Sequence, residues 1–220
     1  MNTSLILVIV IVVAVTLVSM ILHELMHGLT AYLLGDDTAK VNGRLTLNPF
    51  KHIDPFMTII LPVVMAVAGL PIFGGAKPVP YNPDKVKGGE WGAALVAIAG
   101  PLTNLVLALV CFAVLAFALP YLPGIVHLVL IYGVQVNLGF FAFNILPIPP
   151  LDGSRVLYAV APEGVQRAMD GIERMGLLLI FFIVMVASPV IGQLLNSVIT
   201  GLLDVFAFIF QSAPFTGLLW

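Results

Sequence analysis

The sequence predicts an all-α protein that crosses a membrane several times. Hydrophobic residues make up 60% of the 220 residues, charged residues make up 9%, and the mean hydropathy is +1.12; a soluble domain has about 25% charged residues. Residues 91–151 contain no Asp, Glu, Lys or Arg, which is enough for two membrane helices of about 20 residues each. We therefore expect about five or six hydrophobic segments within one integral membrane domain, residues 1–220.

The first hydrophobic segment, residues 4–34, predicts one long helix that ends where Gly35 is followed by two aspartates. It lacks the basic start of a signal peptide and leads directly into a polar motif, so we expect it to be a retained span. Trp91 begins the next long apolar run as an interfacial anchor. Prolines in residues 120–124 divide that run into expected helices over 92–119 and 125–146.

The remainder of the chain predicts shorter polar elements and a hydrophobic end. Residues 153–174 alternate arginines with acids and indicate an aqueous loop with a short helix. Residues 175–211 predict one or two hydrophobic helices, interrupted at Pro189. The single cysteine, Cys111, lies in an apolar segment and excludes a disulfide framework. The net charge of −2 does not indicate a nucleic-acid partner.

Basic residues indicate an orientation in the membrane. Residues 35–54, 74–90 and 153–174 hold three Lys or Arg each, and the positive-inside rule places all three segments in the cytoplasm. The apolar segment 55–73 then begins and ends on the same side. Its internal prolines and glycine suit a re-entrant element buried against protein. The alternative is an ordinary short span.

The most informative motif is His-Glu-Leu-Met-His at positions 23–27, at the end of the first hydrophobic segment. Ionisable side chains at membrane depth are costly and indicate function. On a helix, His23 and His27 project from one face, as two ligands of one metal ion must. Glu24 is then placed to take a proton from water beside the metal.

A catalytic zinc site needs a third protein ligand. Asp152 is the best candidate, because it follows the 125–146 helix at the cytoplasmic end, behind a proline cluster that prevents a regular helix. Gly153 would permit a sharp turn there. The alternative is that Asp152 is the N-cap residue of a helix that begins near Ser154. His52 is expected to serve loop structure, and His127 lies towards the predicted outer side.

Several motifs in this order together resemble the site-2 proteases, which are intramembrane zinc metalloproteases. They are His23 to His27, Gly100-Pro-Leu-Thr-Asn104 and Asn144-x-x-Pro-x-Pro-x-Leu-Asp-Gly153. The stretches 43–55 and 75–79 resemble the minimal prokaryotic branch, which lacks a PDZ or appended regulatory domain. The similarity runs from about Met20 to Arg155, within an expected catalytic core of about residues 4–155.

The resemblance implies a role for each motif. It implies one catalytic Zn²⁺ held by His23, His27 and Asp152, with Glu24 as the catalytic base and Asn144 aiding substrate binding or the oxyanion. For Asn104 the resemblance implies a contact with the substrate; the alternative is an interhelical hydrogen bond. A small strand-like element near 74–79 would hold an extended substrate at its edge, unless it is a plain polar loop. Its residues are Gly74, Gly75, Ala76, Lys77, Pro78 and Val79.

The implied function is hydrolysis of a peptide bond within or near the transmembrane segment of a membrane-protein substrate, in regulated intramembrane proteolysis. The expected location is the cytoplasmic membrane, as a multi-pass protein in the lipid bilayer with the active site towards the cytoplasm. A metal-binding transporter is one alternative, but it would need midplane ligands and repeated halves. A membrane zinc hydrolase of another family is a second alternative.

Overall fold

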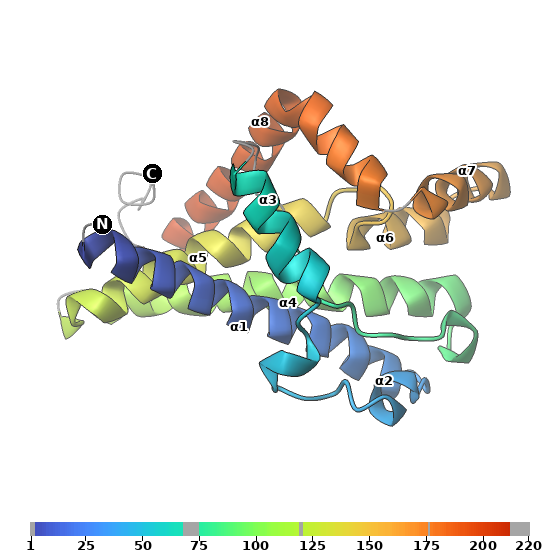
Figure 1. Cartoon of the computed structure of the whole chain (residues 1–220), viewed down its shortest axis with the longest axis horizontal. Helices are drawn as coiled ribbons and strands as arrows, with labels where there is room; N and C mark the ends of the chain where they lie inside the picture. Colours follow the sequence, from blue (N-terminus) through green and yellow to red (C-terminus); the bar gives the residue numbers. More distant parts are fainter. Residues whose placement is uncertain (1–2, 68–74, 119–120, 176, 212–220) are drawn as a thin grey trace. The chain divides into compact units, whose positions relative to one another are not determined.

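The computed structural model describes residues 3–67, 75–118, 121–175 and 177–211, and within these ranges it is helical with no assigned strand (Figure 1). This confirms the all-α prediction. The elements, in chain order, are α1 Thr3–Leu33, α2 Thr38–Val41, η1 Pro49–Lys51, η2 Pro55–Ile60, α3 Leu61–Val67, η3 Pro83–Lys85, α4 Gly89–Ala118, α5 Gly124–Asn144, α6 Asp152–Val160, α7 Glu163–Arg174 and α8 Leu177–Ile209.

Helices long and apolar enough to cross a membrane confirm a multi-pass protein. Within the described residues there are four candidate spans: Leu5–Leu33, Gly89–Ala118, Gly124–Asn144 and Pro189–Ile209. The expected five or six hydrophobic segments are not confirmed.

The segment 55–73 is described only as far as Val67. It begins as a π-helix, η2, and continues as the short helix α3, while residues 68–73 lie outside the described part. The described helical turns alone are shorter than the roughly 20 residues that a spanning helix needs. The choice between a re-entrant element and a short span therefore stays a prediction.

The expected strand-like element near 74–79 is not confirmed. Gly74 lies outside the described residues, and residues 75–82 are assigned neither helix nor strand. Pro78 and Pro80 have no N–H, so they cannot donate ladder hydrogen bonds.

The aqueous loop with one short helix expected over 153–174, and the interruption expected at Pro189, need correction. Residues 153–174 form two helices, α6 and α7, because Pro162 disfavours helical backbone at the residue before it. The two helices are tied by an ion pair between Arg155 and Glu173. The hydrophobic end forms one helix, α8, which continues through Pro189.

The chain divides into two compact units. Residues 1–19, 102–143 and 189–220 form one unit, and residues 20–101 and 144–188 form the other. The first contains a single charged residue, Asp204, whereas the second contains all nine Lys and Arg and every other acidic residue. We call them the apolar unit and the charged unit.

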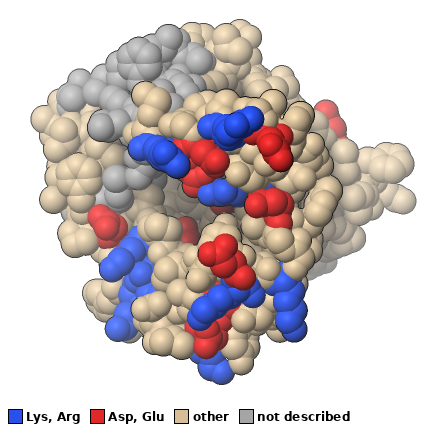
Figure 2. Space-filling view, turned by 90° about the vertical axis from the view of Figure 1, so that its right-hand side faces the viewer, with Lys and Arg blue, Asp and Glu red and all other residues tan. Residues whose placement is uncertain are grey.

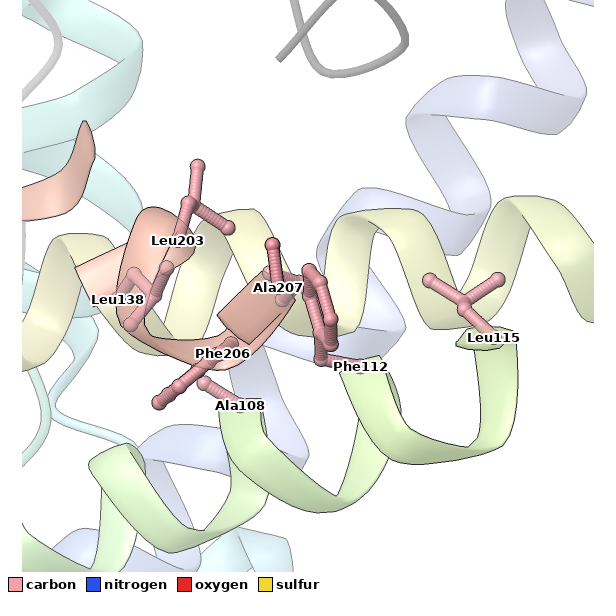
Figure 3. Close-up of a cluster of buried hydrophobic side chains, with 8 residues drawn as sticks. Ala108, Phe112, Leu115, Leu138, Leu203, Phe206 and Ala207 are labelled. Atoms are coloured by element: carbon pink, nitrogen blue, oxygen red, sulfur yellow. The ribbon is translucent and has the colours of Figure 1, made fainter. Parts of the chain in front are cut away.

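The apolar unit is held together by side chains from α4, α5 and α8 (Figure 3). The rings of Phe112 and Phe206 pack edge to face with centroids 5.6 Å apart. Polar contacts join the helices as well: the Asn104 amide nitrogen donates to Asn137 Oδ1 at 2.8 Å and lies 3.4 Å from the Ser19 carbonyl oxygen of α1. Hydrogen bonds between side chains on different helices are a common means of association in lipid.

The charged unit carries the acidic and basic side chains that gather on the face shown in Figure 2. Its small apolar core contains Ala31, Val86 and Val96. The segment between residue 75 and the start of α4 is joined to the end of α1 by a hydrogen bond, in which Lys87 N donates to the Leu34 carbonyl oxygen at 2.8 Å.

Asp36 is the buried anchor of this end of α1. Its carboxylate accepts hydrogen bonds from the Thr38 N–H and hydroxyl and from Asn82 N, the last at 2.6 Å. Burial alone would raise the pKa of Asp36, but the hydrogen bonds from Thr38 and Asn82 outweigh burial and lower that pKa.

The substitution Asp36→Asn is expected to lower the free energy of unfolding at pH 7 by about 2 kcal/mol, since hydrogen bonds to a charged acceptor are the stronger kind. The lowered pKa makes this contribution complete above the unfolded-state pKa of about 3.9. It is lost as the pH falls through the folded-state pKa. Urea unfolding in detergent between pH 7 and pH 3 measures both effects. Equal behaviour of Asp36→Asn and Asp84→Asn, which alters an exposed carboxylate, would contradict the assignment.

Candidate metal centre

The three predicted metal ligands meet within the charged unit. His23 Nε2 and His27 Nε2 are 3.0 Å apart, one turn from each other on α1. Asp152 Oδ2, from the first residue of α6, lies 3.1 Å from His23 Nε2 and 3.4 Å from His27 Nε2. One ligand atom of each residue therefore lies within 4.8 Å of the others, as a shared metal ion requires.

The orientation of His27 is set by its other ring nitrogen. Nδ1 lies 2.8 Å from the carbonyl oxygen of Val96 on α4. A carbonyl only accepts, so Nδ1 carries the proton and Nε2 keeps its lone pair, directed at His23 and Asp152. A metal-binding histidine almost always has such a partner on its second nitrogen.

The donor set fits a zinc ion. Asp152 Oδ2 is buried, and no side chain or main-chain donor of the described residues gives it a hydrogen bond. A buried carboxylate oxygen without a hydrogen-bond donor needs a cation beside it to offset the cost of its burial. Two imidazole nitrogens and one carboxylate oxygen make a ligand set typical of catalytic zinc.

The chain delivers Asp152 as the proline cluster predicted. Leu151 N donates to the Ile148 carbonyl oxygen in a turn, and α6 begins at Asp152. Leu151 occupies the N-cap position, and no side chain caps the helix, which argues against the N-cap alternative for Asp152. Gly153 is needed for close approach, not for a special turn, since a Cβ there would lie 2.2 Å from the Ile145 carbonyl oxygen.

A second glycine, Gly100 on α4, makes room for the histidines. A Cβ at this position would lie 2.4 Å from His27 Nε2 and 2.7 Å from His23 Nε2. Sequence reasoning treated Gly100 as part of a motif. Its position against both ligands was missed, because only the folded arrangement of α4 and α1 in this unit reveals it.

Glu24 lies against the segment predicted to bind substrate. Its Oε2 accepts a hydrogen bond from Val79 N at 2.8 Å. Val79 is buried and packs close to α1, where a Cβ on Gly28 would lie 2.7 Å from Val79 Cγ1. The structure therefore brings the predicted base and the described part of the segment, residues 75–79, together.

Three further groups hold this segment, and sequence reasoning assigned none of them to it. Thr58 Oγ1 donates to the Gly75 carbonyl oxygen at 2.7 Å. Lys77 N donates to the His52 carbonyl oxygen at 2.8 Å, and Arg44 Nη2 donates to the Lys77 carbonyl oxygen at 2.7 Å. The segment is thus fixed along its length by the protein itself.

The other candidate residues lie outside the group of three ligands. Asn144 is the last residue of α5. Asn104 is fully buried and bonded to Asn137, which favours the interhelical alternative for it. His52 is buried and its Nε2 lies 2.8 Å from the Thr46 carbonyl oxygen, consistent with the expected loop role. His127 lies in the apolar unit.

Comparison with known proteins agrees with these motifs. The profile of peptidase family M50 matches residues 10–128. YwhC of Bacillus subtilis, named a zinc metalloprotease, is 42% identical over 205 residues, which cover 89% of this chain and 90% of YwhC. Rip2 of Mycolicibacterium smegmatis, likewise named, is 33% identical over 195 residues, covering 84% of this chain and 69% of Rip2.

Rip2 of Mycobacterium tuberculosis is 33% identical over 205 residues, covering 89% of this chain and 73% of that protein. No solved structure matches the chain significantly. The matched profile covers more than half of the sequence, and the similarity to YwhC runs along most of both chains. The chain therefore belongs to the site-2 protease family, peptidase family M50, and is a membrane metalloprotease with zinc as its cofactor.

Proposed function

We propose that this protein is an intramembrane endopeptidase that cuts a membrane-protein substrate within or near a transmembrane segment, in regulated intramembrane proteolysis. The observation that carries the proposal is the convergence of His23, His27 and Asp152 beside Glu24. Glu24 in turn contacts a segment that is fixed by hydrogen bonds and assigned neither helix nor strand, which a substrate could join.

Each residue has a proposed role in the reaction. His23, His27 and Asp152 would hold zinc, which when bound supplies a Lewis acid for water and for the scissile carbonyl group. Glu24 takes the proton from the attacking water and passes it to the leaving amine. Val79 N–H holds Glu24 Oε2, which leaves Oε1 for the water. Asn144 donates to the negative charge that develops on the carbonyl oxygen.

The substrate would bind as an extended chain beside residues 74–79. A peptide bond inside a helix is shielded and already hydrogen-bonded, so the substrate must unwind before it is cut. Addition of an extended peptide to an exposed edge is a common recognition mode. Hydrogen bonds donated by Thr58 and Arg44, and one accepted by the His52 carbonyl oxygen, fix the described part of this segment in advance, so less ordering is needed when a substrate binds.

The proposed location is the cytoplasmic membrane, with the reaction on the cytoplasmic side. The three proposed ligands lie in the charged unit, which contains all nine basic residues. The positive-inside rule then assigns these basic loops to the cytoplasm. We further propose that both units act as one metalloprotease domain over residues 1–220.

Zinc content and cleavage together test the proposal. Purified protein is expected to hold about one zinc per chain and to cut a transmembrane substrate in proteoliposomes. The substitution Asp152→Ala should remove both properties, because two imidazoles alone bind zinc far more weakly. The matched control is Asp84→Ala, which removes an exposed carboxylate of the charged unit. Full zinc retention in both His23→Ala and Asp152→Ala would eliminate the site, and zinc binding without any cleavage would favour a transporter.

A further inference from the structure

Arg44 is a buried charge without an acidic partner. All nine Lys and Arg lie within the described residues, and Arg44 is the one that is buried, with 7% of its surface exposed. No carboxylate of the described residues forms an ion pair with it. Burying a cation is costly unless its hydrogen bonds are satisfied, so the groups that Arg44 contacts indicate what it does.

Arg44 contacts the main chain just before Val79. Its Nη2 lies 2.7 Å from the Lys77 carbonyl oxygen and 3.3 Å from the Pro78 carbonyl oxygen. Pro78 has no N–H, so the chain at this point can be fixed only through its carbonyl groups. Both contacts come from the single nitrogen Nη2, whereas the buried Nε has no hydrogen-bond partner among the described residues.

Arg44 and Glu24 contact the two ends of a single peptide group, that between Pro78 and Val79. The Pro78 carbonyl and the Val79 N–H belong to the same planar unit and point in opposite directions. Arg44 binds the oxygen of this unit, and Glu24 Oε2 accepts from its N–H at 2.8 Å. The peptide plane therefore cannot rotate without breaking both contacts, and the cation also polarises the peptide group towards stronger donation to Glu24.

We propose that Arg44 is a positioning residue that sets the orientation of the Glu24 carboxylate through the Pro78–Val79 peptide group. The inference rests on the proposed function, in which Glu24 is the base. One carboxylate oxygen is held by Val79, and the other is thereby directed to water. Because the same segment is proposed to bind substrate, Arg44 orients the base and the substrate edge together.

Replacing Arg44 by Met keeps an unbranched, flexible side chain, although a shorter one, and removes its donors. We expect kcat per bound zinc to fall about tenfold or more, the usual effect of losing a hydrogen bond to a charged group. Zinc content should stay unchanged, because Arg44 contacts none of the proposed ligands. The variant Arg44→Lys should recover only part of the rate, since its ammonium group can still donate to a carbonyl oxygen but sits on a shorter and more flexible side chain.

The matched control is Lys40→Met, which removes an exposed cation bonded to the Tyr32 hydroxyl. It should leave kcat, zinc content and amide exchange unchanged. Hydrogen–deuterium exchange gives a readout independent of activity: amides of residues 77–82 should exchange faster in Arg44→Met than in the wild type or in Lys40→Met.

A backbone substitution tests the last link directly. Replacing Val79 by its α-hydroxy acid analogue turns the Pro78–Val79 amide into an ester, which removes the N–H and keeps both Arg44 and the valine side chain. We expect a loss of kcat similar to that of Arg44→Met. This variant decides the matter if Arg44→Met fails to fold or to retain zinc.

The outcomes separate the inference from the proposed function. If the wild type binds zinc but cuts no transmembrane substrate, the proposed function fails. If the wild type is active and either Arg44→Met or the Val79 ester keeps its rate per zinc within about twofold, Glu24 is not positioned through this peptide and the inference is overturned. Reduced zinc content with a normal rate per zinc would likewise assign Arg44 a merely structural role.

Discussion

Replacing Glu24 by Gln is expected to abolish proteolysis while zinc stays bound. Glutamine is nearly isosteric with glutamate, and its amide oxygen can still accept the Val79 N–H that now contacts Oε2. It cannot accept a proton from water, and a general base contributes about 10²–10⁴-fold to a rate. The turnover of a transmembrane substrate in proteoliposomes and the zinc content of the same sample measure the two properties.

The control for this substitution is Glu163→Gln at the exposed start of α7, which should cut at the wild-type rate. A Glu24→Gln protein that retains substrate binding could also trap the substrate for identification. Near wild-type cleavage by Glu24→Gln would show that the base is another group, even if the zinc ligands are assigned correctly.

Replacing Gly100 by Ala should weaken zinc binding about a hundredfold, an effect at the upper end of those seen when the surroundings of metal ligands are altered. The added methyl group would lie 2.4 Å from His27 Nε2 and 2.7 Å from His23 Nε2, so both rings must move off the point at which they meet Asp152. Competition with a zinc chelator measures the affinity.

Gly139→Ala on α5 is the matched control, because a Cβ at Gly139 meets no atom within 4 Å. It should retain zinc as the wild type does. An unchanged zinc affinity in Gly100→Ala would mean that α4 does not approach the histidines as closely as described, and the geometry of the site would have to be revised.

Local patterns in the sequence were sufficient for the elements that depend on local physics. The helix expected over 4–34 is α1, Thr3–Leu33, because an uninterrupted apolar run specifies a membrane helix. The spacing of His23 and His27 placed two ligands on one helix face, and the prolines before Asp152 indicated an irregular approach to the third. In each case the decisive residues are neighbours along the chain.

Several other features that depend on contacts between distant segments were not predicted. Arg44 was counted as one of three basic residues in a polar loop and as part of the 43–55 stretch, but it was given no role, because nothing in its local sequence distinguishes it from an exposed cation. Its burial arises from residues 77 and 78, which lie more than thirty positions away. The two helices of residues 153–174 had a local signal, since proline is common at helix starts, but Pro162 was not given that weight.

The buried amides of the apolar unit determine how its helices are rotated relative to one another. In lipid, an apolar helix gains little free energy from packing one apolar face rather than another against a neighbouring helix. Asn104 and Asn137 break this degeneracy, since the amide of one donates to the oxygen of the other while Asn137 Nδ2 donates to the Gly133 carbonyl oxygen at 2.8 Å. Rolling either helix by one residue, about 100°, would strand both amides in hydrocarbon. The Asn104–Asn137 pair thus selects one rotation of α4 and α5 about their axes from the many that apolar packing alone would tolerate.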